Sequence, residues 1–264
     1  MTILFFGDII GWIGRQAITK VLPELKKKYE PDLVIANAEN LAHGIGITEK
    51  TIQEVALAGV DVFTSGNHIW DKSEAEQIMQ GKKIILLRPA NYPPGVAGMG
   101  HKLLEIGTKK ILIINLLGRV FFKEDFDCPF RKIDEILKEY KNTKLNGVIV
   151  DFHAEATSEK NALGWHTDGR VSAILGTHTH VPTADAKILP QGTAYITDVG
   201  MVGAKDSVIG NTKEPVLKRF LYQLPVALDI PEEGLCQVNA VLIDIDTKTG
   251  LAKKIERLDL EVKI

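Results

Sequence analysis

A chain of 264 residues with 45% hydrophobic and 25% charged residues has the composition of an ordinary globular protein and can bury a sizeable core. Its formal net charge of −2 excludes the basic footprint of proteins that bind double-stranded nucleic acid by broad electrostatic attraction. No stretch approaches the ~20 apolar residues of a membrane helix, and Asp8 interrupts the apolar N-terminal run too early for a signal peptide. Cys128 and Cys236 lie far apart in the sequence, which argues against a disulfide framework. We therefore expect a cytoplasmic protein in a reducing compartment, with no membrane partner.

In the first half of the chain, apolar runs alternate with helical patterns. Residues 2–6 predict a central strand ending at Gly7-Asp8, and the helix predicted next, over 15–29, contains Pro23, which predicts a kink or a break. Thr48 is a good N-cap residue for a further helix. The other elements predicted here are strands over 32–36, 60–64 and 84–87, a helix over about 72–79, a loop over 88–95 and a hairpin of strands over 102–106 and 110–116.

The second half continues in the same way and ends in an antiparallel pair. His166 lies in a segment, 164–170, that we interpret as a turn. No internal repeat or composition shift marks a linker, so we expect a single domain over 1–264. The predicted elements are helices over 131–140 and 215–222 and strands over 148–152, 171–175, 186–189, 193–197, 238–245 and 253–260.

Five of the predicted strands run directly into side chains that can bind metal ions. In an α/β sheet the loops beyond the carboxyl ends of the strands converge on one crevice, so we expect these side chains to meet. An isolated His-x-His pair is more often exposed on a loop. Here, however, four of the seven histidines follow strands, and an extended backbone would turn His178 and His180 to the same side. The strand-end residues are Asp8, Glu39 with Asn40, Asn67 with His68, His153, and His178 with His180.

These side chains form a donor set with a definite chemical character. Seven candidates, carboxylates, amides and imidazoles without thiolate, are too many for one tetrahedral zinc ion but suit two metals that share a bridging carboxylate. Mixed oxygen and nitrogen donors suit manganese, iron, zinc or cobalt better than calcium or magnesium. Two such ions roughly 3.5–4 Å apart can hold a bridging hydroxide and clamp a phosphoryl group.

The order and spacing of these motifs over roughly the first 180 residues resemble the calcineurin-like metallophosphoesterases. Two departures from the usual pattern stand out: Asp8 is not followed by the histidine of an Asp-x-His motif, and Glu39 replaces a bridging aspartate, with Asn40 beside it. Those departures resemble the YmdB-like bacterial branch of cyclic-nucleotide phosphodiesterases over the whole chain. The motifs that carry the resemblance are Gly7-Asp8, Glu39-Asn40, Gly66-Asn67-His68, His153 and Gly176-Thr177-His178-Thr179-His180, together with Trp70-Asp71, Arg88-Pro89-Ala90-Asn91 and the stretch 151–157.

The resemblance implies an α/β fold, a four-layer α/β/β/α sandwich, with a site for two metal ions, commonly iron or manganese, with zinc possible. It implies that Glu39 bridges the two ions and that His68 is the general acid that protonates the leaving oxygen, while a metal-bridging hydroxide attacks phosphorus. By the same resemblance, metal one takes Asp8, Glu39, Asn40 and His180, and metal two takes Glu39, Asn67, His153 and His178.

Three functions fit these expectations. The first is hydrolysis of cyclic nucleotides, 2′,3′- or 3′,5′-cyclic or both. The alternatives are a phosphomonoesterase or 5′-nucleotidase on the same site, and a regulatory protein that holds a nucleotide or an RNA end with little turnover. His43 is either a surface residue or a substrate contact, and the apolar stretches 120–122 and 222–225 belong either to the core or to an interface of a homo-oligomer.

Overall fold

The apolar runs of the chain assemble into two stacked sheets in the computed structural model, which describes residues 1–81 and 83–264. The first sheet has the order β13-β12-β11-β1-β2-β3-β4. Its strands β11, β1, β2, β3 and β4 run parallel, and β12 runs antiparallel to both β1 and β11. The bounds are β1 Thr2–Ile9, β2 Leu33–Asn37, β3 Val62–Thr64, β4 Ile85–Leu86, β11 Met201–Ala204, β12 Leu235–Ile245 and β13 Ala252–Lys263.

The second sheet has the order β5-β6-β7-β8-β10-β9, with β6, β7, β8 and β10 parallel and an antiparallel strand at each edge. The predicted hairpin of β5 and β6 is confirmed. The bounds are β5 His101–Ile106, β6 Lys109–Leu117, β7 Gly147–His153, β8 Ala173–Thr177, β9 Lys187–Ile188 and β10 Ala194–Ile196.

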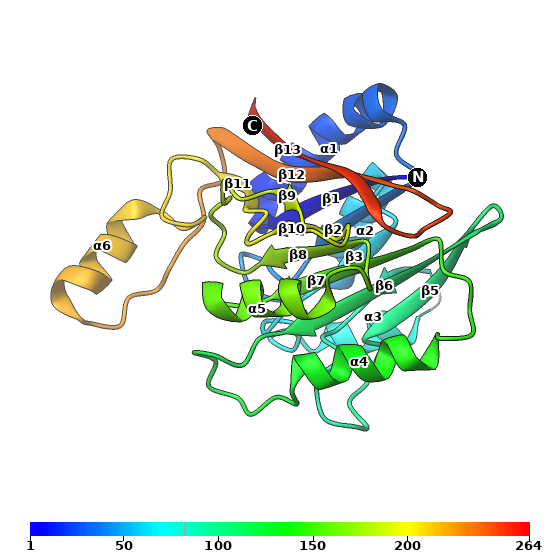
Figure 1. Ribbon diagram of the computed structural model, residues 1–264. Coiled ribbons are helices and arrows are strands. Elements are labelled where there is room, and N and C mark those ends of the chain that lie inside the picture. Colours follow the sequence, from blue (N-terminus) through cyan, green and yellow to red (C-terminus); the bar gives the residue numbers. More distant parts are fainter. Residues whose placement is uncertain (82) are drawn as a thin grey trace.

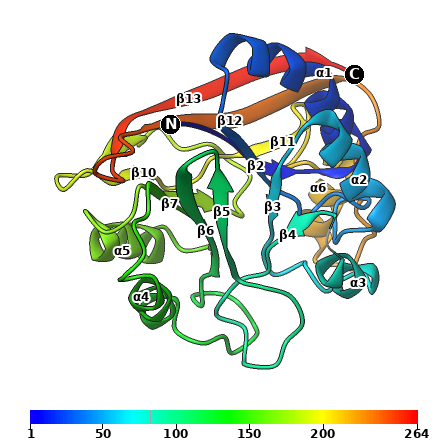
Figure 2. The same ribbon diagram turned by 90° about the vertical axis from the view of Figure 1, so that its right-hand side faces the viewer.

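Helices cover the outer face of each sheet. Figures 1 and 2 show α4 and α5 on one flank and α1, α2 and α3 on the other, while α6 stands away from the layered body. The N-cap prediction is confirmed, because the Thr48 side chain accepts from the backbone N–H of Thr51. The bounds are α1 Gly11–Tyr29, α2 Glu49–Ala58, α3 Glu74–Gln80, α4 Pro129–Glu139, α5 Thr157–Thr167 and α6 Lys213–Tyr222.

Successive side chains of one strand enter different cores. On β1, Leu4 and Phe6 pack toward the helices, whereas Ile3 and Phe5 pack between the sheets. A third core lies between the second sheet and the helices α4 and α5. Burial on both faces explains why the parallel strands read as continuous apolar runs. The four-layer α/β/β/α prediction is thereby confirmed.

The structure corrects the prediction for the first helix. The helix begins at Gly11, not at residue 15, and continues through Pro23 without a break. Gly14 lies against the backbone of β11, where a Cβ would overlap the Val202 carbonyl oxygen. This close packing explains why the first turn of the helix contains a glycine. Buried side chains on both sides of the proline, Ile18 and Leu25 among them, hold the two halves against the same sheet.

Two elements were not predicted. Helix α5 contains His166, which is therefore not the turn residue that we expected, and Gly164 in this helix packs against the ring of Tyr195. Strand β11 pairs with the end of β1, so that β1 continues through Asp8 to Ile9. The apolar pattern of four residues was too short to identify β11. None of the described helices is long and apolar enough to cross a membrane.

Candidate active site

The eight predicted site residues lie at the carboxyl ends of five strands, where the two sheets meet. The first sheet supplies Asp8 on β1, Glu39 and Asn40 after β2, and Asn67 and His68 after β3; the second supplies His153 at the end of β7, and His178 and His180 after β8. Close approach is possible at β3 because a Cβ on Gly66 would overlap the His153 ring and the Glu39 carboxylate. All eight predicted residues belong to one cluster joined by short contacts.

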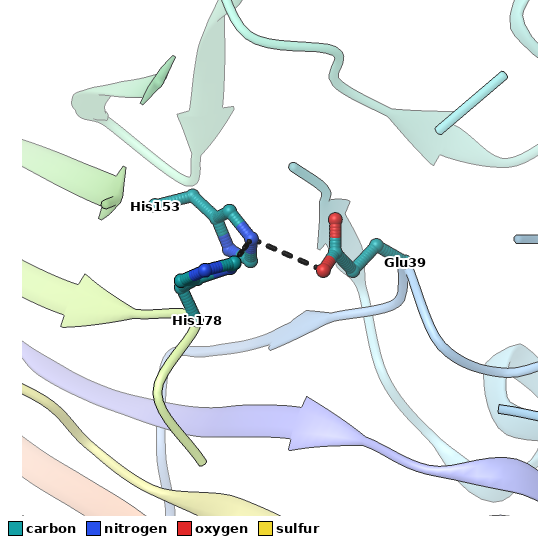
Figure 3. A group of neighbouring side chains, drawn as sticks. All are labelled: Glu39, His153 and His178. Carbon is teal, nitrogen blue, oxygen red and sulfur yellow. Dashed lines mark hydrogen bonds and ion pairs between the residues drawn. The ribbon is translucent and has the colours of Figure 1, made fainter. Parts of the chain in front are cut away.

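Three potential ligand atoms lie around Nε2 of the His153 imidazole. Its Nε2 lies 3.1 Å from Glu39 Oε1, 3.2 Å from Asn67 Oδ1 and 2.9 Å from His178 Nδ1. Figure 3 shows the two rings and the carboxylate facing one another across a small gap. The Glu39, His153 and His178 ligand atoms lie within 4.8 Å of one another, the spacing of a metal-binding group. This is the donor set expected for metal two.

The donors expected for metal one lie next to this group. Asp8 Oδ1 is 3.8 Å from His180 Nε2, and the Asn40 amide is 3.3 Å from that same nitrogen and 3.3 Å from Glu39 Oε1. Asp8 is completely buried, yet its Oδ1 has no hydrogen-bond partner among the described residues. A buried carboxylate oxygen without a partner costs free energy unless a ligand satisfies it. The orphaned oxygen, pointing among oxygen and nitrogen donors, fits a cation.

The backbone after β8 is not extended, which corrects the expectation for the His-x-His motif. His178 and His180 adopt φ values of 102° and 65°, outside the extended region. Strand periodicity therefore does not explain why both imidazoles enter the site. Instead, Asp8 Oδ2 accepts from the His178 backbone N–H at 3.1 Å, and Asp198 Oδ2 accepts from the N–H of Thr179 at 3.0 Å.

A buried ion pair supports this loop from behind. Lys160 Nζ lies 2.7 Å from Asp198 Oδ2 and donates to the carbonyl of Thr177 at 2.8 Å. Asp198 also accepts from the N–H of Gly200 at 2.9 Å. Removing one member of such a pair leaves a buried charge and costs about 3–5 kcal/mol. Neither residue was predicted, although Asp198 follows a predicted strand and so matches the rule that selected the others.

Contacts behind the imidazoles decide which ring nitrogen each histidine offers. His153 Nδ1 contacts Thr177 Oγ1 at 3.0 Å, and that hydroxyl donates to Asp151 at 2.6 Å, so that Nε2 faces the donor cluster. His178 Nε2 lies 3.0 Å from Glu155, and His180 Nδ1 lies 2.9 Å from the carbonyl oxygen of Ile209. The remaining nitrogens, Nδ1 of His178 and Nε2 of His180, point into the cluster.

Neighbouring charges in the cluster shift the pKa values of its buried groups. Burial lowers the pKa of His153, but the carboxylates around it, Glu39 foremost, raise it to about 9. Burial would raise the pKa of Glu39, and His153 counters this and lowers it to about 2. Burial and then His153 lower the pKa of His178 to about 2. The buried carboxylates thus favour a positive charge at this place in the cluster, which a bound cation would supply.

His68 lies beside the cluster and has a carboxylate partner. Its Nδ1 is 2.5 Å from Asp71 Oδ2, and its backbone N–H donates to Glu39 Oε2 at 3.0 Å. The imidazole is 34% exposed, so that a substrate can reach it. No role is assigned to Asp71 from the sequence, and the structure places it as the hydrogen-bond partner of His68. The pair has the geometry of an acid–base histidine whose tautomer and orientation are held by a carboxylate.

Two hollows adjoin the cluster, of about 550 and 470 Å³, and both are bordered by His68, Glu155 and His178. His43, which was predicted to be either a surface residue or a substrate contact, lines the larger hollow and is exposed there. The larger hollow is further lined by Glu39, Asn40, Gly44, Ile45, Thr179, His180, Ile209, Asn211, Arg219 and Leu228.

Comparison with known proteins gives close matches over the whole chain. The model of a family described as "YmdB-like protein" matches residues 4–258. A protein of Bacillus subtilis (strain 168) named 2′,3′-cyclic-nucleotide 2′-phosphodiesterase is 49% identical over 259 residues, which cover 98% of this chain and 96% of the relative.

Two solved structures match equally completely. A hypothetical protein from Thermus thermophilus is 41% identical with a TM-score of 0.91, and the match covers 99% of each chain. A structure described as a novel phosphatase of Mycoplasma pneumoniae is 38% identical with a TM-score of 0.92, and the match covers 100% of this chain and 94% of the other.

Proposed function

The chain belongs to the YmdB-like protein family, and on that premise we propose that it is a metal-dependent phosphodiesterase that hydrolyses cyclic nucleotides. Its relatives are named as a phosphodiesterase and a phosphatase, and the chain is accordingly a phosphoesterase. The proposal adds the two metal ions and the cyclic substrate.

One observation carries the proposal: Oδ1 of Asp8 is buried without a hydrogen-bond partner among the described residues, in a cluster with six further residues that carry oxygen or nitrogen donors, Glu39, His153 and His178 among them. Glu39 lies between the two donor groups, with Oε1 close to both His153 and the Asn40 amide, which suits a carboxylate shared by two ions. Mixed oxygen and nitrogen donors without thiolate favour iron or manganese, and zinc is compatible with them. When bound, two such ions would supply Lewis acidity and a nucleophile from water at neutral pH.

The chain itself provides the proton for the leaving group. An alkoxide is a poor leaving group, so that cleavage of a ribose ester needs a general acid, and His68 is a partly exposed histidine in contact with the donor cluster. Asp71 holds Nδ1 of that ring and leaves Nε2 for the leaving oxygen. The hydrogen bond from the His68 backbone to Glu39 keeps the acid at a fixed position relative to the cluster.

A substrate panel tests the proposal. Metal-loaded protein is expected to hydrolyse 2′,3′-cyclic nucleotides, the substrate class in the name of the Bacillus relative, faster than 3′,5′-cyclic nucleotides or nucleoside monophosphates. The measurement is phosphate-ester hydrolysis resolved by chromatography. Phosphate release from the monophosphates alone would contradict the proposal.

A phosphomonoesterase is the second candidate, since the Mycoplasma pneumoniae structure is described as a phosphatase. The same panel separates the two activities.

The His68–Asp71 pair argues against a regulatory protein that holds a nucleotide with little turnover, because a protein that only binds a nucleotide has no need of an oriented proton donor.

A further inference from the structure

The segment between β6 and α4 presents an aromatic side chain to solvent beside the site. Phe121 is 82% exposed, and its backbone has a φ of 71°. A bulky residue in the left-handed region is uncommon. Because the Phe121 ring is exposed, it contributes little hydrophobic stabilisation to the fold. Such a strained, exposed residue at a site suggests a function in binding.

The exposure of Phe121 is not due to a loosely held loop. The carboxylate of Glu159 accepts from the backbone N–H groups of Arg119 at 3.0 Å and Val120 at 3.2 Å. On the other side of Phe121, the ring of Phe122 packs against His178 with 5.1 Å between the ring centroids. The residues on either side are therefore held by buried or site residues, and Phe121 is presented at a fixed place.

That place is the smaller of the two hollows. Its volume of about 470 Å³ lies within the range of small-molecule sites, roughly 300–1,000 Å³. The hollow is lined by Asn67, His68, Phe121, Phe122, Lys123, Glu124, Glu155 and His178. An exposed aromatic ring, the proposed proton donor His68 and two of the expected metal ligands, Asn67 and His178, therefore line the same hollow.

We propose that Phe121 is the platform on which the nucleobase of the substrate stacks, which rests on the proposed function. In a 2′,3′-cyclic nucleotide the base is attached to C1′, next to the carbon that bears the 2′ oxygen. If His68 protonates that oxygen, the base must lie close to His68, and the hollow that contains Phe121 borders the same imidazole. Every base has a face that can stack on an aromatic ring. Phe121 therefore raises the affinity for a nucleotide without discriminating between the four bases.

Stacking also determines which ester bond is cleaved. A base held on Phe121 fixes the rotation of the ribose about the reacting phosphate and so presents the 2′ oxygen to His68. Cleavage there breaks the bond between phosphorus and the 2′ oxygen and leaves the phosphate on the 3′ oxygen: water supplies the hydroxyl to phosphorus, His68 gives its proton to the 2′ oxygen, and the proton released by the water replaces it. Without the platform the 3′ oxygen can take the same place, and the 2′-phosphate appears among the products.

The test compares Phe121→Ala and Phe121→Trp with Phe220→Ala as the matched control, because Phe220 on α6 is 71% exposed and lines neither hollow. Steady-state hydrolysis of 2′,3′-cyclic AMP and of base-free ribose 2′,3′-cyclic phosphate is measured on metal-loaded protein, with the ratio of the product isomers. We expect Phe121→Ala to raise KM for 2′,3′-cyclic AMP by roughly tenfold. We expect kcat to stay within about twofold.

Hydrolysis of the base-free substrate is expected to be the same in Phe121→Ala and in the wild-type protein. Phe121→Trp keeps an aromatic ring and is expected to show a KM as low as that of the wild-type protein and a single product. An unchanged KM and product ratio in Phe121→Ala would overturn the platform while wild-type turnover leaves the proposed function standing. An equal loss on both substrates would also overturn it, since that is a general defect. Absence of wild-type turnover of 2′,3′-cyclic AMP would overturn the proposed function and the platform with it.

Discussion

Glu39→Gln is expected to remove both metal binding and hydrolysis. Oε1 of this carboxylate lies close to both donor groups, 3.1 Å from His153 Nε2 and 3.3 Å from the Asn40 amide. A neutral amide binds a cation much more weakly than a carboxylate. The loss should therefore exceed the roughly 10–100-fold that follows removal of a supporting hydrogen bond around a metal site. Metal content by mass spectrometry and kcat on 2′,3′-cyclic AMP are the two measurements.

Glu105→Gln is the matched control, because Glu105 lies exposed on β5, away from the cluster. It changes the same functional group and should leave metal content and rate unaltered. If Glu39→Gln kept two ions and a normal rate, the bridging role would be wrong. Circular dichroism of both variants separates a local effect from unfolding.

His68→Ala is expected to lower kcat on 2′,3′-cyclic AMP by about 10²–10⁴-fold, the usual contribution of a general acid, while metal content stays normal. The effect should depend on the leaving group. Bis(p-nitrophenyl) phosphate releases a stable phenolate that needs little protonation, so its hydrolysis should fall much less. The measurement is the ratio of the two rate losses.

His166→Ala is the control for this variant, because His166 on α5 forms a similar pair with Asp134 at 3.1 Å but lies outside both hollows. It should leave both rates unchanged. Equal rate losses on the two substrates in His68→Ala would assign His68 to substrate binding or to metal positioning. That result would contradict its role as proton donor.

The fold could be predicted because buried parallel strands leave an unmistakable pattern. Runs such as 148–152 and 171–175 place apolar side chains on both faces of the sheet, and the predicted helix over 131–140 carries an apolar stripe. Once these strands were identified, a single geometric rule, that carboxyl ends of parallel strands meet, brought eight polar residues to one place. The structure brings the same eight together.

What could not be predicted depends on contacts that are distant in the sequence. Strand β11 is only four residues long and is identified by its pairing with the end of β1. The turn that carries His178 and His180 is supported by the Lys160–Asp198 pair, whose lysine lies on an unpredicted helix. No local pattern encodes either feature.

Other omissions had a signal in the sequence. Asp71 is three residues after His68, and a single turn, closed by the hydrogen bond from Asp71 N to His68 O at 3.2 Å, brings the two side chains together. Asp151 is two residues before His153 on β7, and two residues along a strand is the spacing of side chains on one face. Both partners could have been assigned from spacing alone.

Metal add-back tests the role of the donor cluster most directly. The protein is stripped of metal and given Mn²⁺, Fe²⁺, Zn²⁺ or Mg²⁺ in turn, and bound ions and hydrolysis of 2′,3′-cyclic AMP are measured on the same samples. We expect two ions per chain and a rate that returns with them, highest with iron or manganese. A stripped protein that hydrolyses at the full rate, or a protein that binds two ions and hydrolyses nothing, would contradict a metal-dependent phosphodiesterase.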